Sequence, residues 1–268
     1  MKILDWLSLP GNETNEDTIW YNENCAIVLD GSTSLKGSFY PASVFVKDFI
    51  NVFSEQIAKT GTLYKAVNDT ISVLKKKLNL QEKADASQIL PSAAGVFVYE
   101  TENSIQILTI GDCTAILFGN FGIKKIYSDE VESFDNKVIQ RMIQLRHSSG
   151  ADIRDIVSWD EIRNMLVENR KMMNHPDGYR IISMDMKPVS EKDIVSFNKN
   201  TVNKVVLYSD GFDFMEKEIL DGETDFHALY QKLRKSEESD SLLNMDPRFK
   251  KSDDASIISL QISHEQNN

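Results

Sequence analysis

The sequence predicts an α+β protein with two antiparallel sheets packed face to face and flanked by helix pairs, a four-layer α/β/β/α sandwich. Two observations predict this class. Apolar residues follow a helical spacing in two separate blocks, and between the blocks the spacing changes to the two-residue period of strands. Helices that come in pairs between runs of strands argue against a doubly wound parallel sheet, in which single helices alternate with single strands.

The N-terminal half begins with a short apolar strand at residues 25–29, which ends at an Asp-Gly pair. Two amphipathic helices are expected next, at residues 42–59 and 63–78, because apolar side chains recur there every three or four positions. Gly61 lies between them and supplies the break. This half therefore contributes one strand and the first helix pair.

The rest of the chain alternates between strand runs and helices. Strands are expected at residues 95–99, 104–110, 115–118, 123–127, 179–183, 194–197, 204–208 and 256–262. Helices are expected at residues 135–146, 159–173 and 225–234. The polar stretch 236–251 is expected to form a surface loop. Because no composition shift marks a boundary, residues 1–268 are predicted to form a single domain.

Composition excludes several classes of function. The net charge is −11, and such a surface repels nucleic acid and anionic lipid, which both bind mainly through their phosphates. Apolar runs are too short to cross a membrane, and residues 1–6 carry an acidic residue where a signal peptide needs an apolar core. We therefore expect a cytoplasmic protein. Cys25 and Cys113 are expected to be reduced and apolar in role, and the four histidines lack the spacing of zinc ligands.

Acidic residues occur where predicted strands begin or end. The five positions are Asn15-Glu16-Asp17, Asp30-Gly31, Gly111-Asp112, Asp210-Gly211 and Asp253-Asp254. Carboxylates at the ends of neighbouring strands meet at one rim of a sheet, where their repulsion is tolerable only if water or cations separate them. Ligands that are all oxygen suit Mg²⁺ or Mn²⁺. The competing interpretation is that each Asp-Gly pair is simply a turn, which is the commoner role of that dipeptide.

In this order, the five motifs resemble those of the PP2C-type metal-dependent serine/threonine phosphatases, and the chain looks like a bacterial-type member. The resemblance extends over about residues 11–262, and its specificity comes from the order and spacing of short motifs. It implies the same α/β/β/α sandwich and a metal centre at one end of it.

The resemblance also implies a ligand set. Asp30 matches the carboxylate that bridges two ions, and Gly31 matches the residue whose backbone carbonyl binds one of them. Asp210 and Asp253 match ligands of the other ion, and Asp112 matches a position linked to an additional ion in bacterial members. The cofactors implied are thus two Mn²⁺ or Mg²⁺ ions, with a third as a further option.

The implied reaction is hydrolysis of phosphoserine and phosphothreonine monoesters by water that the two ions activate, without a covalent enzyme intermediate. Glu16 and Asp17 match the acidic pair that contacts metal-bound water, and with Asp30 they form the expected catalytic set. The expected partner is a phosphorylated protein substrate. The sequence does not indicate which protein this is, nor the oligomeric state.

One position departs from the family pattern, and one segment has two interpretations. Asn12 stands where many members carry an arginine that grips the substrate phosphate. Lys36 and Arg180 are candidate replacements, against the simpler interpretation that each is an ordinary surface side chain. Residues 164–179 resemble a flap in bacterial relatives, although the turn formers around His175 favour a plain turn, and the apolar residues of this segment favour a core position.

Three alternatives to an active protein phosphatase remain. The loss of the arginine favours a catalytically weak member that binds a phosphorylated partner as a regulator. A small-molecule phosphomonoesterase on the same scaffold is a second alternative, because substrate choice depends on loops. A non-enzymatic acidic interaction module fits least well, since its charges have no reason to lie at strand ends.

Overall fold

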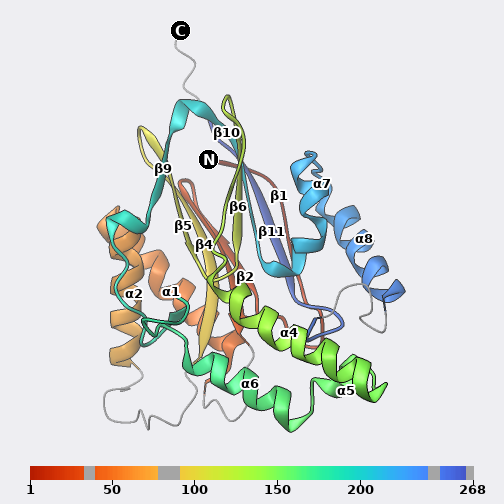
Figure 1. The fold of residues 1–268 in the computed structure, drawn as a ribbon. Helices are drawn as coiled ribbons and strands as arrows, with labels where there is room; N and C mark the ends of the chain where they lie inside the picture. Colours follow the sequence, from red (N-terminus) through yellow and green to blue (C-terminus); the bar gives the residue numbers. More distant parts are fainter. Residues whose placement is uncertain (33–39, 78–90, 241–247, 264–268) are drawn as a thin grey trace.

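The computed structural model describes residues 1–32, 40–77, 91–240 and 248–263, and it places two antiparallel sheets face to face between helices (Figure 1). The first sheet has five strands in the order β1 (Lys2–Leu9), β11 (Ala255–Gln261), β10 (Val202–Tyr208), β6 (Thr114–Gly119) and β7 (Gly122–Ile126). The second has six strands, namely β2 (Thr18–Tyr21), β3 (Cys25–Ser32), β4 (Ser92–Glu100), β5 (Ser104–Ile110) and β9 (Val195–Asn198) in order, with β8 (Ile182–Ser183) beside β4.

Both sheets are buried on their two faces, which explains why their central strands are almost wholly apolar. In β3, Ile27 and Leu29 point to the helices outside the sheet, whereas Ala26 and Val28 point to the space between the sheets. The two-residue period of a strand produces this division. The layer between the sheets is filled from both sides, because β10 and β11 also contribute to it.

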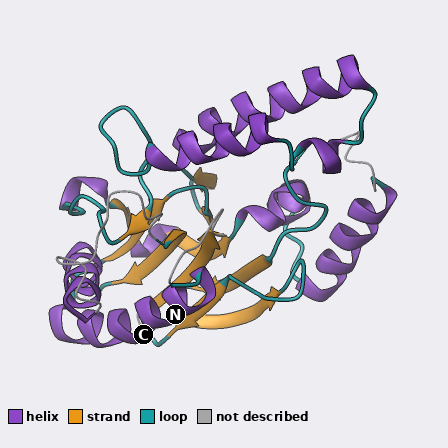
Figure 2. Cartoon of the chain, turned by 90° about the horizontal axis from the view of Figure 1, so that it is seen from below, coloured by secondary structure: helices purple, strands orange, loops and turns teal. Residues whose placement is uncertain are grey.

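Helices cover the outer faces, which completes the predicted four layers (Figure 2). The helix α1 (Ala42–Thr60) packs on the second sheet through Phe45, Phe49 and Phe53. The helix α2 (Leu63–Lys77) joins the same apolar cluster through Leu63, Val67 and Leu74. On the first sheet, α7 (Glu216–Leu220) and α8 (Phe226–Ser239) bury their apolar sides. Short 3₁₀ helices, η1 (Glu191–Asp193), η2 (Lys199–Thr201) and η3 (Asp210–Met215), connect the later strands.

A further group of helices lies at the lower end of the sandwich in Figure 1. These helices are α4 (Glu130–Ser149), α5 (Ile153–Ile156) and α6 (Asp160–Lys171). They enclose a small apolar cluster of their own, which includes Val138, Met142 and Ile162. We call α4, α5 and α6 the cap helices. Helices α4 and α6 were predicted, α4 from residue 135 rather than Glu130, whereas the short α5 was missed. The sequence does not reveal that all three gather at the end where the acidic strand ends lie.

The predicted strand at residues 179–183 is largely wrong. Only Ile182 and Ser183 pair with β4, and Tyr179 forms an isolated bridge with Met173. Side chains satisfy the backbone before β8: the N–H of Arg180 donates to Glu130 and that of Ile181 donates to Asn174. A side-chain acceptor here replaces the neighbouring strand that the apolar alternation predicted.

The structure differs from the predicted elements in other places, where one strand was missed and one helix is longer than expected. The edge strand β1 was missed, because charged and polar residues interrupt its apolar positions. Helix α8 continues to Ser239, so residues 236–239 are helical rather than loop. The predicted end of the second helix at Leu78 and residues 241–247 of the predicted loop lie outside the described residues. Cys25 and Cys113 are buried free thiols.

No helix in the described ranges combines the length and the apolar character that crossing a membrane requires.

The stacked rings beneath α1 should dominate the stability of this half of the protein. Phe49 is fully buried and lies against Phe45, Phe53 and Phe97. We expect Phe49→Ala to lower the free energy of unfolding by about 3–5 kcal/mol, because it removes a ring and leaves a cavity. Val44→Ala, on the exposed side of the same helix, should change it by less than about 0.5 kcal/mol in urea denaturation. Equal effects of the two changes would contradict this packing.

Candidate metal centre and active site

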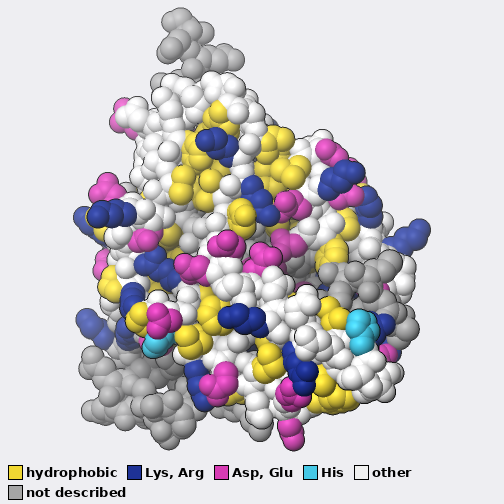
Figure 3. All heavy atoms as spheres, in the orientation of Figure 1, with side chains coloured by type: hydrophobic (Ala, Val, Ile, Leu, Met, Phe, Trp, Pro, Cys, Tyr) yellow, Lys and Arg dark blue, Asp and Glu magenta, His cyan; other side chains and the backbone are white. Residues whose placement is uncertain are grey.

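A cavity of about 880 Å³ lies between the strand ends and the cap helices. Its wall combines three kinds of side chain. Carboxylates come from Asp30, Asp112, Asp135, Asp160, Asp210, Asp213, Glu237 and Asp253; cations come from Arg163, Arg170, Arg248 and Lys250; apolar groups include Val131, Ile139, Leu166, Met173, Phe214 and Phe249. On the surface, acidic side chains gather near the middle of the face drawn in Figure 3.

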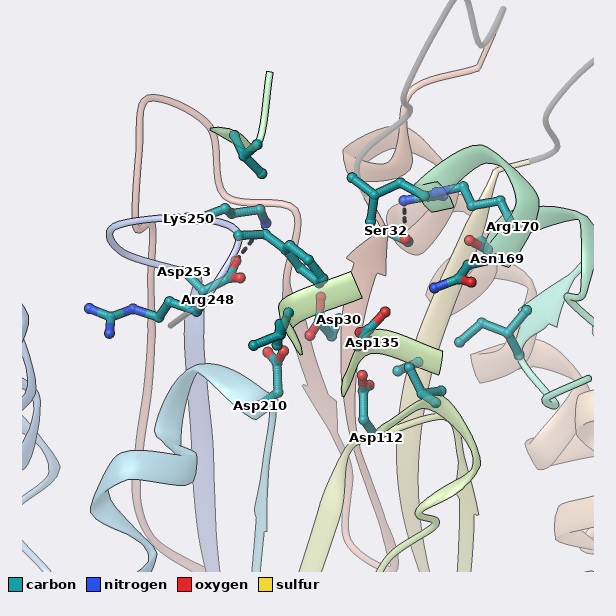
Figure 4. A pocket seen from close by; sticks show the side chains of 18 of the residues that line it. Asp30, Ser32, Asp112, Asp135, Asn169, Arg170, Asp210, Arg248, Lys250 and Asp253 are labelled. Carbon is teal, nitrogen blue, oxygen red and sulfur yellow. Dashed lines mark hydrogen bonds and ion pairs between the residues drawn. The ribbon is translucent and has the colours of Figure 1, made fainter. Parts of the chain in front are cut away.

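Four predicted carboxylates reach this cavity from separate strands of the two sheets (Figure 4). Asp30 lies near the end of β3, Asp112 follows β5, Asp210 follows β10, and Asp253 precedes β11. Because β3 and β5 belong to one sheet and β10 and β11 to the other, the cavity lies at the shared end of both sheets. The strand-end pattern therefore predicted the convergence of these four residues correctly.

Two glycines permit the tight packing behind the carboxylates. A Cβ atom on Gly31 would lie 2.5 Å from the backbone oxygen of Glu16. A Cβ atom on Gly211 would lie 1.9 Å from the backbone oxygen of Asp254. Only glycine fits at either position, so the glycine of each Asp-Gly pair packs against a neighbouring loop and the pair is not a free turn.

Hydrogen bonds tie the loops of this rim together. The two carboxylate oxygens of Asp254 accept from the N–H groups of Gly11 and Glu16, at 2.8 Å and 2.6 Å. From α8, Arg234 donates to the backbone oxygen of Asp253 at 2.6 Å. These bonds hold the N-terminal loop and the loop before β11 in fixed positions, and the bond from Arg234 fixes the backbone from which the Asp253 side chain extends.

Asp30, Asp112 and Asp210 carry strongly perturbed pKa values. Burial raises the pKa of Asp30 well above its usual range, and the charges of Asp210, Asp17 and Asp112 raise it further. Burial first and nearby carboxylates second raise the pKa of Asp210 to about 7. Burial likewise raises the pKa of Asp112 to about 7, with Asp135 adding to the effect. Such groups resist ionisation unless a cation compensates their charge.

Glu16 and Asp17 are not among the residues that line the cavity. Asp17 is buried and accepts a hydrogen bond of 2.7 Å from the hydroxyl of Ser209, the residue before Asp210. Burial raises the pKa of Asp17 to about 8, although hydrogen bonds from Ser209 and Ser256 lower it. Asp17 therefore contacts Ser209, the residue next to Asp210, and does not line the cavity.

The donor set suits a hard divalent cation. The Oδ1 atom of Asp210 is buried and has no hydrogen-bond partner among the described residues, and the same holds for Oδ1 of Asp17. The cavity end where the strands meet supplies carboxylates without any histidine or cysteine on the wall, which is the chemistry that Mg²⁺ and Mn²⁺ prefer. As placed, however, no three acidic, histidine or cysteine side chains of the described ranges surround a single point closely enough to hold an ion.

Lys250 occupies part of this acidic space. Its Nζ atom lies 2.7 Å from Oδ1 of Asp253 (Figure 4). Although burial lowers the pKa of Lys250, the carboxylates of Asp253, Asp30 and Asp210 raise it above its ordinary value. An ammonium group is thus paired with one of the predicted metal ligands.

The comparisons with known proteins decide the family. The family model described as Protein phosphatase 2C matches residues 14–248. The chain belongs to the protein phosphatase 2C family. This membership places it among the metal-dependent serine/threonine phosphatases, and the predicted resemblance is confirmed. The matched range contains Asp30, Asp112 and Asp210 but ends before Asp253.

Solved structures share the fold at low sequence identity. Stp1 from Staphylococcus aureus is 17% identical, with 97% of this chain and 94% of that chain covered and a TM-score of 0.55. The catalytic domain of PstP, solved in complex with two manganese ions, is 12% identical, with 97% of each chain covered and a TM-score of 0.57. MsPP from Mycobacterium smegmatis, in complex with cacodylate, is 14% identical, with 98% and 100% covered and a TM-score of 0.54. The search of curated proteins gives no match.

The cap helices of this phosphatase add site residues that the sequence did not single out. Asp135 of α4 lines the cavity, and burial raises its pKa to about 6, although the nearby charge of Arg170 lowers it. Arg170 of α6 donates to the hydroxyl of Ser32 at 2.6 Å. It thereby links the cap helices to the segment directly after Asp30-Gly31. The helical spacing of apolar residues in the cap helices does not indicate that Asp135 and Arg170 reach the cavity, because the position of these helices depends on tertiary packing.

The segment 164–179 is part of this cap. Leu166 and Met173, expected in the core, are only partly buried and line the cavity. The turn expected around His175 is confirmed by a hydrogen bond of 3.1 Å from the N–H of Gly178 to the oxygen of His175. Leu166 packs against the apolar cluster of the cap helices and Met173 against the core between the sheets, so the expected core contacts are present, and the same two side chains also form an apolar side of the cavity.

Of the two candidate replacements for the arginine, only Arg180 lies in the described part of the chain. Arg180 pairs with Asp193 at 2.8 Å and is not among the cavity residues. Lys36 lies outside the described residues. The amide of Asn12 donates to the backbone oxygen of Ser252 at 3.3 Å. Asn12 therefore lies against the loop that also contains Lys250.

Asp254 should stabilise the fold by linking two loops, and the loss of stability in a variant should depend on how many acceptor oxygens remain at this position. Asp254→Ala leaves the N–H groups of Gly11 and Glu16 without their acceptors, and we expect a loss of about 2–3 kcal/mol in the free energy of unfolding. Asp254→Asn keeps one acceptor oxygen and should lose less. Urea denaturation of the three proteins measures this order, and a larger loss for Asn than for Ala would contradict it.

The raised pKa values predict how the stability of the metal-free phosphatase depends on pH. The pKa of Asp112 and of Asp210 is about 7 in the folded chain against 3.8 for an ordinary aspartate, so folding favours the protonated form. The stability contributed by these groups is complete below about pH 4 and is lost as the pH rises through about 7. We expect the Tm in a chelating buffer to fall over this window.

Asp210→Asn removes one titrating group and should flatten the same curve. The comparison needs thermal unfolding of both proteins at several pH values between about 4 and 8. Parallel curves would show that Asp210 does not titrate in this window.

Proposed function

We propose that this phosphatase hydrolyses phosphoserine and phosphothreonine monoesters with water that two divalent ions activate. The observation that supports the proposal most directly is the meeting of Asp30, Asp112, Asp210 and Asp253 in one cavity of a protein phosphatase 2C fold. The manganese in the related PstP domain supports Mn²⁺ as the ion, with Mg²⁺ as the alternative of similar ligand preference. We take residues 1–268 as one phosphatase domain.

The residues that would hold the ions are Asp30, the backbone carbonyl of Gly31, Asp210 and Asp253, with Asp112 available for a third ion. When bound, the ions would lower the pKa of water for attack on phosphorus and neutralise charge on the phosphoryl oxygens. The raised pKa values of Asp30 and Asp210 support this assignment, because these groups need a cation to stay ionised at neutral pH.

The remaining residues position these ligands. Asp17 acts through Ser209 on the adjacent Asp210, since it accepts the Ser209 hydroxyl. Glu16 contributes its backbone, which meets Gly31 and Asp254. We therefore assign Glu16 and Asp17 to holding the ligand loops, in addition to the contact with metal-bound water that the family resemblance implies.

The apolar part of the cavity bears on the substrate. Leu166, Met173, Phe214 and Phe249 provide a wall onto which the chain around a phosphorylated residue could pack. Such a wall suits a protein segment better than a small, highly polar phosphate ester. This supports a phosphorylated protein as the substrate class over a small-molecule phosphomonoester.

Hydrolysis of an aryl phosphate and of a phosphoserine peptide, each with added Mn²⁺, tests the proposal. Asp210→Asn should lower kcat by at least about a hundredfold, because it removes an anionic ligand from the centre. Asp221→Asn makes the same chemical change on an exposed residue at the end of α7 and should leave the rate unchanged. Equal rates for wild type and Asp210→Asn would overturn the assignment.

Metal binding measured on the same samples separates this function from its alternative. Tight Mn²⁺ binding together with negligible hydrolysis of both substrates would instead favour a regulator that binds phosphorylated partners.

A further inference from the structure

The loop before β11 brings a lysine to the acidic end of the cavity. Lys250 and Asp253 both line the cavity, and their charged atoms lie 2.7 Å apart (Figure 4). The lysine side chain is 40% exposed and the aspartate side chain 36% exposed, so the pair faces the cavity rather than the protein interior. A substrate that enters the cavity can therefore reach this ammonium group.

The backbone on both sides of Lys250 is anchored. Phe249 packs against the apolar cluster of the cap helices. Arg248 donates to the backbone oxygen of Lys251 at 2.9 Å, and Arg234 donates to that of Asp253 at 2.6 Å. The loop is thus fixed at residues 248–253, while the four-carbon stem of the lysine leaves its ammonium group free to turn from one anion to another.

The other described cations of the cavity wall that are close to the carboxylates have different contacts. Arg170 donates to Ser32, and the guanidinium of Arg248 points away from Asp30 and Asp210 toward Lys251 and Asp240 (Figure 4). Lys250 is paired directly with a residue that, under the proposed function, must bind a metal ion. When Asp253 binds that ion, the lysine loses its present partner and keeps its charge beside the centre.

We propose that Lys250 serves two anions in turn: it neutralises Asp253 in the metal-free protein, and in the metal-loaded protein it binds the phosphoryl oxygens of the substrate. This inference rests on the proposed function. A phosphate dianion that approaches several carboxylates is repelled, and an ammonium group with three donors at the cavity wall offsets that repulsion. The neutral Asn12 donates to the backbone oxygen of Ser252, two residues after Lys250 in the same loop, so Lys250 supplies positive charge near a residue that has none.

Two binding measurements on the full chain test the proposal without any turnover. Isothermal titration with Mg²⁺ gives the metal affinity of the chelator-treated protein, and titration with inorganic phosphate at saturating Mg²⁺ gives the anion affinity. In Lys250→Met we expect Mg²⁺ to bind about threefold tighter or more, because Asp253 no longer has a competing cation. We expect phosphate to bind about tenfold weaker, the size of one lost charge-assisted hydrogen bond.

Two further variants provide controls. Lys251→Met makes the same change at the next residue, which is exposed, and should match wild type in both titrations. Lys250→Arg keeps the charge and should restore most of the phosphate affinity. The opposite signs for Mg²⁺ and phosphate are the signature of the proposal, because simple damage to the loop would weaken both.

Any other outcome for Lys250→Met overturns the inference: unchanged phosphate affinity, unchanged Mg²⁺ affinity, or weaker binding of both. A wild-type protein that binds Mg²⁺ and phosphate but hydrolyses nothing would overturn the proposed function. In that case the titrations of Lys250→Met still decide whether Lys250 exchanges Asp253 for a phosphate anion. The two failures are therefore distinguishable.

Discussion

The mutual repulsion of carboxylates in a partly buried site is the constraint on which the rest of this structure depends. Asp30, Asp112 and Asp210 extend from different strands into one cavity, and burial together with their neighbours raises the pKa of each. Left to themselves, such groups would move apart or take up protons. They stay together because each is fixed to a strand end, and the strands are held by an apolar core on both faces of both sheets.

The loops behind the carboxylates transmit that rigidity. Asp254 accepts from two N–H groups of the N-terminal segment, and Arg234 holds the backbone of Asp253 from α8. The close approach at Gly211 removes the space in which the rim could relax. Stability and function are therefore opposed locally, because the same packing that places the carboxylates also makes the metal-free site costly at neutral pH. Lys250 reduces that cost at one carboxylate, since its ammonium pairs with Asp253.

The fold was largely predictable, because apolar periodicity reflects which faces are buried. The helices α1 and α2 and most strands were expected within a few residues, and so was the pairing of helix layers with two sheets. The misses share a cause. The edge strand β1 has little apolar alternation, because charged and polar residues interrupt it. The segment before β8 satisfies its backbone through side chains, as when the N–H of Arg180 donates to Glu130. Such contacts depend on residues distant in sequence, so no local pattern reports them.

The sequence by itself determined which carboxylates could meet, because Asp30, Asp112, Asp210 and Asp253 each lie next to a strand and strands of packed sheets end at a common rim. Only the tertiary structure decided what surrounds them. The cap helices bring Asp135 and Arg170 to the cavity, and the loop before β11 places Lys250 on Asp253. Asp17 lies behind Ser209 rather than at the cavity wall. The physical reason is that a strand end fixes the position of its own residue, whereas neighbours from other segments depend on how the whole chain packs.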